Sequence, residues 1–266
     1  MKNHLRLSVL MPVFNERATV AESVKRVREA GLSVEIVCVD DASNDGTAQI
    51  LRELLDAGEI DQLAVHDVNQ GKGAAVKTAL ARATGDVVVI QDADLEYDPR
   101  ELHRLLAPFA DGRADAVFGS RFRGETTRVL YYWHSVGNRM LTTFSNMLTN
   151  INLSDMETCY KMVRTDLMQS LPLTSGRFGI EPELVARLAQ AKARIYEVPI
   201  SYSGRTYAEG KKIGWRDGFA AFWHIFRSNL LPPRAPVYTP PEMRVPANSK
   251  PLPSTSRPAL APHAES

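Results

Sequence analysis

The sequence predicts an α/β fold in which a doubly wound, mostly parallel sheet is flanked by helices. Short runs of β-branched, apolar residues alternate with amphipathic helical segments over the first half of the chain. The joints between them are short, as in parallel strand–helix–strand units. Several of these runs, such as residues 87–90, are apolar throughout, which is typical of strands buried on both faces. Together these observations favour a parallel sheet covered by helices on two sides.

The expected strands are rich in Val, Ile and Leu. They cover residues 7–13, 34–39, 63–65, 87–90, 114–118, a run ending at 163, and 194–202. Pro199 suggests that the last of these lies at a sheet edge or stops there.

The expected helices have recognisable starts and stops. Residues 15–17 open the first and Gly31 closes it as a left-handed cap. Residues 45–47 and the pair Asp98–Pro99 open two others. Helical patterns continue over residues 74–83, 99–110, 129–151, 178–191 and 214–231. Strand and helix therefore alternate until about residue 120, where the order becomes less regular.

Composition sets limits on the class of protein. The chain has 266 residues, 44% of them hydrophobic and 24% charged, which suits one large domain or two small ones. We expect a catalytic domain over residues 1–231 and a disordered tail over 232–266, where Pro, Ala and Ser dominate. The net charge of +1 does not indicate a nucleic-acid partner.

The two cysteines and the apolar runs bear on the compartment. Cys38 and Cys159 share no metal-type spacing, so we interpret both as reduced thiols of a cytoplasmic protein. The N-terminus carries no apolar signal core. No run of about 18 apolar residues suggests a membrane span. Any contact with a membrane is therefore expected to be peripheral.

Polar clusters follow the first four strands. They are Asn15–Glu16, Asp40–Asp41, residues 70–73, and Asp92 with Asp94. Ligands of such sheets bind beyond the carboxyl ends of the strands, so four clusters at one edge favour a binding site over solvated loops. Asp92 and Asp94 are two residues apart, on one side of an extended chain, where they could hold a hard divalent cation together with ligand phosphates. On that motif alone, a capped turn is an equal alternative.

Other motifs narrow the ligand. The glycine-rich loop at 69–73 lacks both the spacing of an ATPase phosphate loop and a dinucleotide fingerprint, which weighs against kinases and dehydrogenases. Arg121 and Arg123 follow a strand beside small residues, where arginines suit a phosphate, although two solvated arginines are the alternative. The glycine-flanked basic loop at 204–212 could close over phosphates.

Two helical stretches are unusually aromatic. Residues 129–151 contain Tyr131, Tyr132 and Trp133, and residues 214–231 combine Trp and Phe with basic residues. This composition fits an interfacial helix on a membrane surface, and packing against the sheet is the alternative.

In combination, these motifs resemble the family 2 inverting glycosyltransferases, in the bacterial branch similar to dolichyl-phosphate mannosyltransferase. The matching stretches are residues 11–16 (MPVFNE), 39–47 (VDDASNDGT), 69–73 (NQGKG), 91–94 (QDAD), 119–122 (GSRF) and the 205–212 loop. The resemblance covers about residues 7–231. It implies a GT-A, Rossmann-like fold and the transfer of a hexose from a nucleotide sugar, GDP-mannose or UDP-glucose, to a polyprenyl or dolichyl phosphate at the cytosolic face of the membrane.

The resemblance also implies roles for individual residues. Those expected to contact the donor nucleotide or its diphosphate are Pro12, Val13, Asn15, Glu16, Asp40, Asp41, Lys72, Gly73, Asp92, Arg205 and Lys212. Asp92 and Asp94 match the motif that holds Mg²⁺ or Mn²⁺. Glu96 stands where the family often has Gln, so its place among the ligands is left open.

For the acceptor, the resemblance assigns the phosphate to Arg121, which with Asp94 forms the expected catalytic pair. A second acceptor arginine has no clear match, and His134 or Arg139 could take its place. An ionised lipid phosphate needs no strong general base, so positioning and electrostatics carry the rate. Expected partners are the donor, the lipid acceptor and a membrane surface, with a separate membrane protein as a further candidate.

Two alternatives remain open. A hydroxyl acceptor would require a carboxylate base, for which Asp155 and Glu157 are the candidates. A non-catalytic nucleotide-sugar sensor or scaffold is the other.

Overall fold

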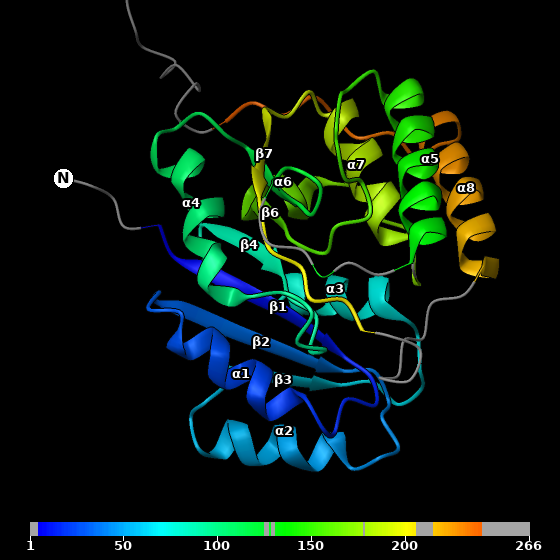
Figure 1. The fold of residues 1–266 in the computed structure, drawn as a ribbon. Helices are drawn as coiled ribbons and strands as arrows, with labels where there is room; N and C mark the ends of the chain where they lie inside the picture. The colour runs from blue at the N-terminus through cyan, green and yellow to red at the C-terminus, as the bar shows by residue number, and fades with distance from the viewer. Residues whose placement is uncertain (1–4, 125–127, 129–130, 178, 206–214, 241–266) are drawn as a thin grey trace, which may run out of the picture.

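A seven-stranded sheet forms the centre of the protein (Figure 1), with strand order β3-β2-β1-β4-β6-β5-β7. The structure is a computed structural model that describes residues 5–124, 128, 131–177, 179–205 and 215–240, with the backbone alone at 215–219. Its strands are β1 (Leu7–Val13), β2 (Val34–Asp40), β3 (Gln62–Val65), β4 (Val87–Ile90), β5 (Ala116–Ser120), β6 (Lys161–Arg164) and β7 (Ile195–Pro199). Among these strands only β6 runs antiparallel to its neighbours, β4 and β5. The expectation of a mostly parallel sheet is confirmed.

Helices lie on both faces of the sheet. They are α1 (Val20–Glu29), α2 (Thr47–Asp56), α3 (Lys72–Leu80), the 3₁₀ turn η1 (Pro99–Glu101), α4 (Leu102–Ala110), α5 (Tyr132–Thr149), α6 (Thr165–Ser170), α7 (Ile180–Gln190) and α8 (Trp215–Leu230). In Figure 1, α1 and α2 lie together beside β2 and β3, whereas α5, α7 and α8 pack against one another at the other end of the sheet. The molecule thus has a regular first half and a helix-rich second half.

The register of the central strands explains where the site lies. β1 pairs in parallel with β2 so that Val13 is opposite Asp40, and with β4 so that Leu10 is opposite Ile90. The side chains of β4 are all buried, as its uninterrupted apolar sequence predicted. Since β1, β2 and β4 run the same way, their polar extensions emerge at one edge of the sheet.

The predicted helix boundaries hold where a cap determines them. Gly31 has φ +74 after the end of α1, and Asp98 accepts a hydrogen bond from the Arg100 amide at 3.0 Å ahead of Pro99. These are the left-handed cap and the helix start expected from the sequence. Both cysteines are free thiols in the structure, and both are buried.

The structure describes residues 232–240, the first part of the segment that the sequence assigns to the tail. Residues 232–240 belong to the described chain and lie against the domain, although they form no helix or strand. The Tyr238 amide donates to the Ala191 carbonyl at 2.9 Å, and its hydroxyl donates to Asp166 at 2.9 Å. The Ala235 amide donates to Gln190 at 3.1 Å. The sequence did not reveal these hydrogen bonds, because Tyr238 and Ala235 are isolated residues in a proline-rich segment and form no periodic pattern. Residues 241–266 lie outside the described chain.

Candidate functional site

Asp92 and Asp94 lie in the turn that follows β4. Leu95 between Asp94 and Glu96 has φ +65, and the Glu96 amide donates to Asp94 at 3.1 Å. Burial, followed by the neighbouring charges of Asp92 and Glu96, raises the pKa of Asp94 to about 7. The turn therefore holds a buried carboxylate beside two other acidic side chains.

Two basic side chains reach this cluster from distant parts of the chain. Lys72 Nζ lies 2.9 Å from Asp92 Oδ2. The Arg205 guanidinium lies 3.3 Å from Asp94 Oδ2, 3.4 Å from Glu96 Oε1 and 3.6 Å from Glu16 Oε2. The structure thereby brings together six of the residues predicted from the sequence.

The turn suits a divalent cation that shares its ligands with a phosphate. Among the described residues, no group of three or more His, Cys, Asp and Glu side chains is arranged to hold a metal alone. Mg²⁺ typically uses one or two carboxylates and completes its shell with water and substrate phosphates. Asp94, whose pKa is raised by burial and by the charges of Asp92 and Glu96, fits this description, with Asp92 beside it.

Glu96 has other partners. Its carboxylate accepts a hydrogen bond from the Tyr202 hydroxyl at 2.7 Å and from the Arg205 amide at 2.9 Å. These contacts fix the segment that follows β7 against the turn after β4. Metal ligation by Glu96 stays a prediction, whereas its role in placing Arg205 is visible in the geometry.

The segment after β1 forms one wall of a hollow. Asn15 has φ +53; its amide donates to Ser43 Oγ at 2.9 Å, and its own Oδ1 accepts from the Asn44 amide at 2.9 Å. The Glu16 amide donates to Thr47 Oγ1 at 3.1 Å. The hollow has a volume of about 480 Å³ and is lined by residues 15–19, Asp45 and Arg205. Hydrogen bonds therefore join the loop after β1 to the loop after β2, beside the acidic turn. Pro12 and Val13 end the strand that leads into this wall.

Asp40 and Asp41 are adjacent but differ in what they bind. Asp40 is 1% exposed, and its Oδ1 has no hydrogen-bond partner among the described residues. An unsatisfied buried acceptor is unfavourable, so this atom is suited to receive a donor from a ligand. Asp41 instead accepts from the Gln70 and Gly71 amides at 2.9 and 2.7 Å and lies 2.7 Å from His66 Nδ1. Asp41 therefore holds the next loop in place.

Arg121 is paired inside the protein. Its Nε and Nη2 donate to the two oxygens of Asp155, each at 2.7 Å, and Asp155 is fully buried. Asn138 on α5 joins them, accepting from Arg121 at 3.3 Å and donating to Asp155 at 3.3 Å. The guanidinium also lies 5.0 Å from the centre of the Tyr202 ring. An acceptor phosphate at Arg121 would share the guanidinium with Asp155.

The other acceptor candidates are not brought to Arg121 in the same way. His134 and Arg139 are exposed on α5, and the contact with Arg121 is made by Asn138 between them. Asn138 was missed by sequence reasoning. Its one available signal was a polar side chain within an aromatic helix, one turn beyond His134. Lys212 lies outside the described residues, as do its neighbours at 206–214.

Asp155 and Glu157 differ sharply in basicity. Burial opposes ionisation of Asp155, but the charge and hydrogen bonds of Arg121 outweigh it and lower the pKa of Asp155. Burial raises the pKa of Glu157 to about 7, assisted by the charge of Glu181. Glu157 Oε1 has no hydrogen-bond partner among the described residues. Of the two, only Glu157 has the basicity of a general base at neutral pH.

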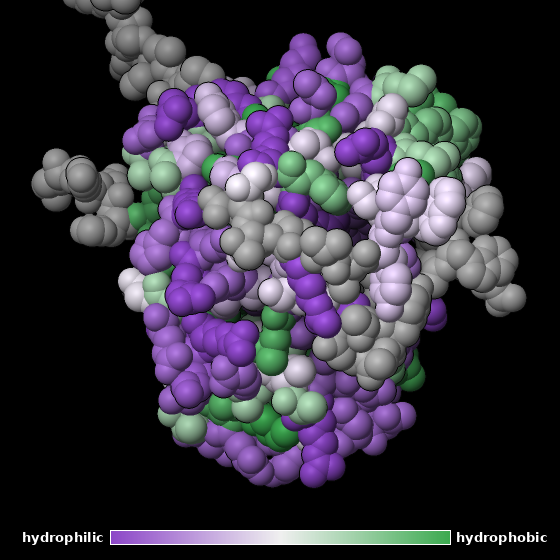
Figure 2. All heavy atoms as spheres, in the orientation of Figure 1, coloured by the Kyte–Doolittle hydropathy of each residue, from purple (hydrophilic) through white to green (hydrophobic). Residues whose placement is uncertain are grey.

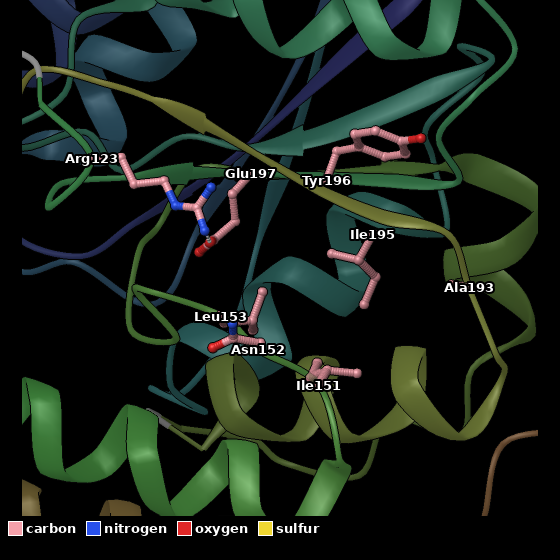
Figure 3. A pocket seen from close by; sticks show the side chains of 8 residues that line it. All are labelled: Arg123, Ile151, Asn152, Leu153, Ala193, Ile195, Tyr196 and Glu197. Carbon is pink, nitrogen blue, oxygen red and sulfur yellow. Dashed lines mark ion pairs between the residues drawn. The ribbon is translucent and has the colours of Figure 1, made fainter.

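A second hollow, of about 420 Å³, lies beside the edge strand β7 (Figure 3). Arg123 and Glu197 point toward each other across it and form an ion pair of 3.0 Å, while Tyr196 points to the other side of the strand. Arg123 lines this hollow, whereas none of the residues to which the family resemblance assigns a donor, metal or acceptor role does.

Helices α5 and α8 present a joint apolar surface. They lie side by side in Figure 1, and the rings of Phe144 and Phe222 are 5.5 Å apart between them. Trp133 is 77% exposed and Met147 75% exposed, far more than is usual for such residues. Green and pale spheres gather on this side of the molecule in Figure 2. The exposed members are Tyr131, Tyr132, Trp133, Met140 and Met147 on or beside α5, and Trp223, Phe226 and Leu230 on α8. Among the described residues, no helix is long and apolar enough to cross a membrane.

Curated relatives cover most of this chain. A low-salt glycan biosynthesis hexosyltransferase of Haloferax volcanii is 30% identical over 79% of this chain, although the match spans only 51% of that relative. An undecaprenyl-phosphate mannosyltransferase of Micrococcus luteus is 28% identical over 85% of this chain and 99% of its own length. A polyprenol monophosphomannose synthase of Mycolicibacterium smegmatis is 30% identical over 79% of this chain and 82% of its own.

Solved structures support the fold. Glucosyl-3-phosphoglycerate synthase of Mycobacterium tuberculosis in complex with UDP matches with a TM-score of 0.66 at 18% identity, over 86% of this chain and 82% of that one. A complex of the same enzyme with Mn²⁺, UDP and glucosyl-3-phosphoglycerate matches with a TM-score of 0.63 at 18% identity, over 86% and 81% of the two chains. The model of glycosyl transferase family 2 matches residues 8–171, which contain every predicted site residue except Arg205 and Lys212. The chain therefore belongs to glycosyl transferase family 2.

Proposed function

We propose that this protein transfers a hexose from a nucleotide sugar to a polyprenyl phosphate. The observation that carries the proposal is the acidic turn after β4, where Asp94 has a pKa near 7 and faces Arg205 at the edge of a hollow. The names of the relatives from Micrococcus luteus and Mycolicibacterium smegmatis support mannose and a polyprenyl phosphate as sugar and acceptor. GDP-mannose is accordingly the first donor to test and UDP-glucose the second.

Asp94, with Asp92 beside it, would hold Mg²⁺ or Mn²⁺, which when bound neutralises charge on the leaving diphosphate. Arg205 is placed to do the same from the protein side, because its guanidinium already lies among the carboxylates and borders the hollow. Asp40 would receive a hydrogen bond from the base or ribose through its unpartnered Oδ1. Asn15 and Glu16 line the hollow and would contact the nucleotide there.

The acceptor side is supported by Arg121 and by the apolar surface of α5 and α8. A lipid phosphate is already ionised near neutral pH, so positioning and electrostatics suffice for its attack on the sugar. The exposed Trp, Tyr, Phe and Met side chains give a peripheral protein a means to bind a bilayer. We place this contact at the cytosolic face, where nucleotide sugars are available, and we place the end of the catalytic domain at about Pro240.

The test uses the full chain with polyprenyl phosphate, Mn²⁺ or Mg²⁺, and a panel of nucleotide sugars, with the lipid product identified by mass. Asp94→Asn is expected to lower transfer by at least about 100-fold, the scale of losing a main source of electrostatic stabilisation. Asp98→Asn removes a carboxylate from the neighbouring helix cap and serves as the control. Turnover by Asp94→Asn equal to that of the unmodified protein would contradict the metal assignment.

A hydroxyl acceptor is the second candidate, and one observation favours it. Glu157 has a pKa near 7 and an oxygen without a partner, as a general base requires. If Glu157→Gln abolishes transfer to soluble sugars while Arg121→Lys does not, the hydroxyl reading replaces the lipid-phosphate reading. If donor binds but no acceptor in the panel supports transfer or hydrolysis, the non-catalytic alternative is favoured.

A further inference from the structure

Glu181, in the first turn of α7, makes a contact that the proposed function does not use. Its Oε1 lies 2.8 Å from Lys72 Nζ, the same ammonium that lies 2.9 Å from Asp92 Oδ2. The three side chains are 9%, 15% and 23% exposed in that order. Burial works against the charge on Lys72, yet the charges around it, Asp92 foremost, hold its pKa well above the ordinary value. Lys72 is therefore a permanent cation shared between Asp92 and Glu181.

The glycines on either side of Lys72 bring Glu181 into reach. The Ala74 amide donates to the Gly176 carbonyl at 2.9 Å, which joins the start of α3 to the segment before α7. A Cβ on Gly73 would lie 2.5 Å from the Ser175 carbonyl oxygen. A Cβ on Gly71, at φ +91, would lie 2.7 Å from the Gly176 carbonyl oxygen. Glycine at both positions thus permits a close approach of two backbones.

The neighbouring Glu183, and not Glu181, holds the loop before α7 in place. Its carboxylate accepts hydrogen bonds from the Thr174 amide at 2.9 Å and the Ser175 amide at 2.7 Å. It also accepts from the Thr174 hydroxyl at 2.7 Å. Glu183 therefore fixes the loop before α7, while Glu181, two residues earlier, points to the acidic turn. The two glutamates form a natural experimental pair.

We propose that Glu181 is a positioning residue of the donor site, acting through Lys72 on Asp92. By sharing Lys72, it leaves Asp92 with enough negative charge to attract a divalent cation, and it holds the ammonium at one fixed place beside the diphosphate. Without it, Lys72 would neutralise Asp92 alone. This inference rests on the proposed function, because it requires that Asp92 and Asp94 attract a cation.

The net charge of Asp92, Lys72 and Glu181 predicts how substitutions in this group change Mn²⁺ affinity. Asp92, Lys72 and Glu181 together carry one net negative charge. Glu181→Gln removes that charge and is expected to weaken Mn²⁺ binding by about 10-fold, the lower end of effects seen when partners of metal ligands are removed. Lys72→Met makes the group more negative and should tighten Mn²⁺ binding. The double variant returns to the original charge and should bind Mn²⁺ within about threefold of the unmodified protein.

The experiment measures Mn²⁺ affinity of the full chain by electron paramagnetic resonance, without nucleotide, and follows folding by thermal unfolding. Glu183→Gln is the matched control: it should lower the melting temperature and leave the affinity of the folded protein unchanged. Equal Mn²⁺ affinity in folded Glu181→Gln and the unmodified protein overturns the inference, as does a double variant that binds as weakly as Glu181→Gln.

Three further outcomes are decisive. If Glu181→Gln does not fold, Lys72→Met tests the same contact from the other partner: tighter Mn²⁺ binding supports the inference and unchanged binding overturns it. If Asp94→Asn binds Mn²⁺ as well as the unmodified protein, both this inference and the proposed metal site fail. Mn²⁺ binding that depends on Asp94 but not on Glu181 or Lys72 removes this inference alone.

Discussion

Arg121 and Arg205 are both arginines near strand ends that face carboxylates, yet they are held in opposite ways. Arg121 donates two hydrogen bonds of 2.7 Å to one buried partner, Asp155. Arg205 spreads its guanidinium over three carboxylates, Asp94, Glu96 and Glu16, at 3.3 to 3.6 Å. Strong charge-assisted pairs usually lie at 2.7–2.9 Å, so Arg121 is bound tightly and Arg205 loosely.

The difference between the two arginines indicates which ion pairs stabilise the fold and which are free to exchange for a ligand. Arg121 loses a good partner if it moves, whereas Arg205 loses little and can transfer to a diphosphate. The same contrast appears in the carboxylates: Arg121 lowers the pKa of Asp155 against burial, while Asp94 keeps a pKa near 7 despite Arg205. We therefore expect Asp155 to matter most for folding, and Asp94 and Arg205 to matter most for ligand binding.

The largest effect on stability is expected from Asp155→Asn. The change leaves the buried Arg121 guanidinium without its counter-charge, and breaking a buried pair in this way typically costs about 3–5 kcal/mol. Urea unfolding at pH 7 measures it. Asp111→Asn, which removes the partner of the exposed Arg113, is the control, and exposed pairs contribute at most about 1 kcal/mol. Equal effects of the two substitutions would show that Arg121 is not held more tightly than a surface arginine.

Asp94→Asn is expected to stabilise the metal-free protein at pH 8 while it abolishes transfer. The pKa of Asp94 rises from 3.8 to about 7 on folding, so its protonated form is the one that folding favours. The stability it contributes is complete below about pH 4 and is lost as the pH rises through 7. At 1.36 kcal/mol per unit, the penalty removed by Asn at pH 8 is about 4 kcal/mol.

Urea unfolding in EDTA at pH 5 and pH 8 checks this prediction. The advantage of Asp94→Asn over the unmodified protein should be greater at pH 8 than at pH 5. An advantage that is independent of pH, or larger at pH 5, would show that Asp94 is not forced toward its neutral form by the surrounding carboxylates.

The smallest effect on stability is expected from Arg205→Gln, about 1 kcal/mol or less, because its contacts are long and shared. The substitution should change ligand binding more than stability, and it should affect Mn²⁺ and the donor in opposite directions. Without nucleotide, Mn²⁺ should bind more tightly, since a competing cation has left Asp94. The donor KM should rise, since a diphosphate contact is lost.

Electron paramagnetic resonance measures the Mn²⁺ affinity, and the transfer rate as a function of donor concentration gives the donor KM. Arg17→Gln is the control, because Arg17 lines the same hollow and its guanidinium donates to the Asp45 carbonyl at 3.4 Å. Weaker Mn²⁺ binding by Arg205→Gln in the absence of nucleotide would show that Arg205 supports the acidic turn instead of competing for it.

Much of the donor side could be predicted because it depends on local pattern and one general rule. Uninterrupted β-branched runs identify β1, β2 and β4, and the parallel arrangement brings their carboxyl ends to one edge. Asn15, Asp40, Asp92 and Asp94 are then expected at the same edge, because each lies at or just beyond the carboxyl end of one of these strands. The family 2 resemblance assigned a donor site to this edge, and the family match confirms the family. The roles of the individual residues stay a prediction.

The pairing of the second half was decided by tertiary structure. The antiparallel insertion of β6 between β4 and β5 has no cue in its four residues, because a short buried strand pairs equally well in either direction. The joining of Arg121 to Asp155 and Asn138, and of Lys72 to Glu181, depends on how α5 and α7 pack against the sheet.

The sequence by itself determined which edge of the sheet carries the carboxylates, since strand direction and side-chain alternation are local properties of the backbone. Only the tertiary structure decided which cation each carboxylate meets, since ion pairs form between segments whose distance along the chain bears no relation to their distance in space. For that reason Arg121 and Arg205 look alike in the sequence and differ in the folded protein.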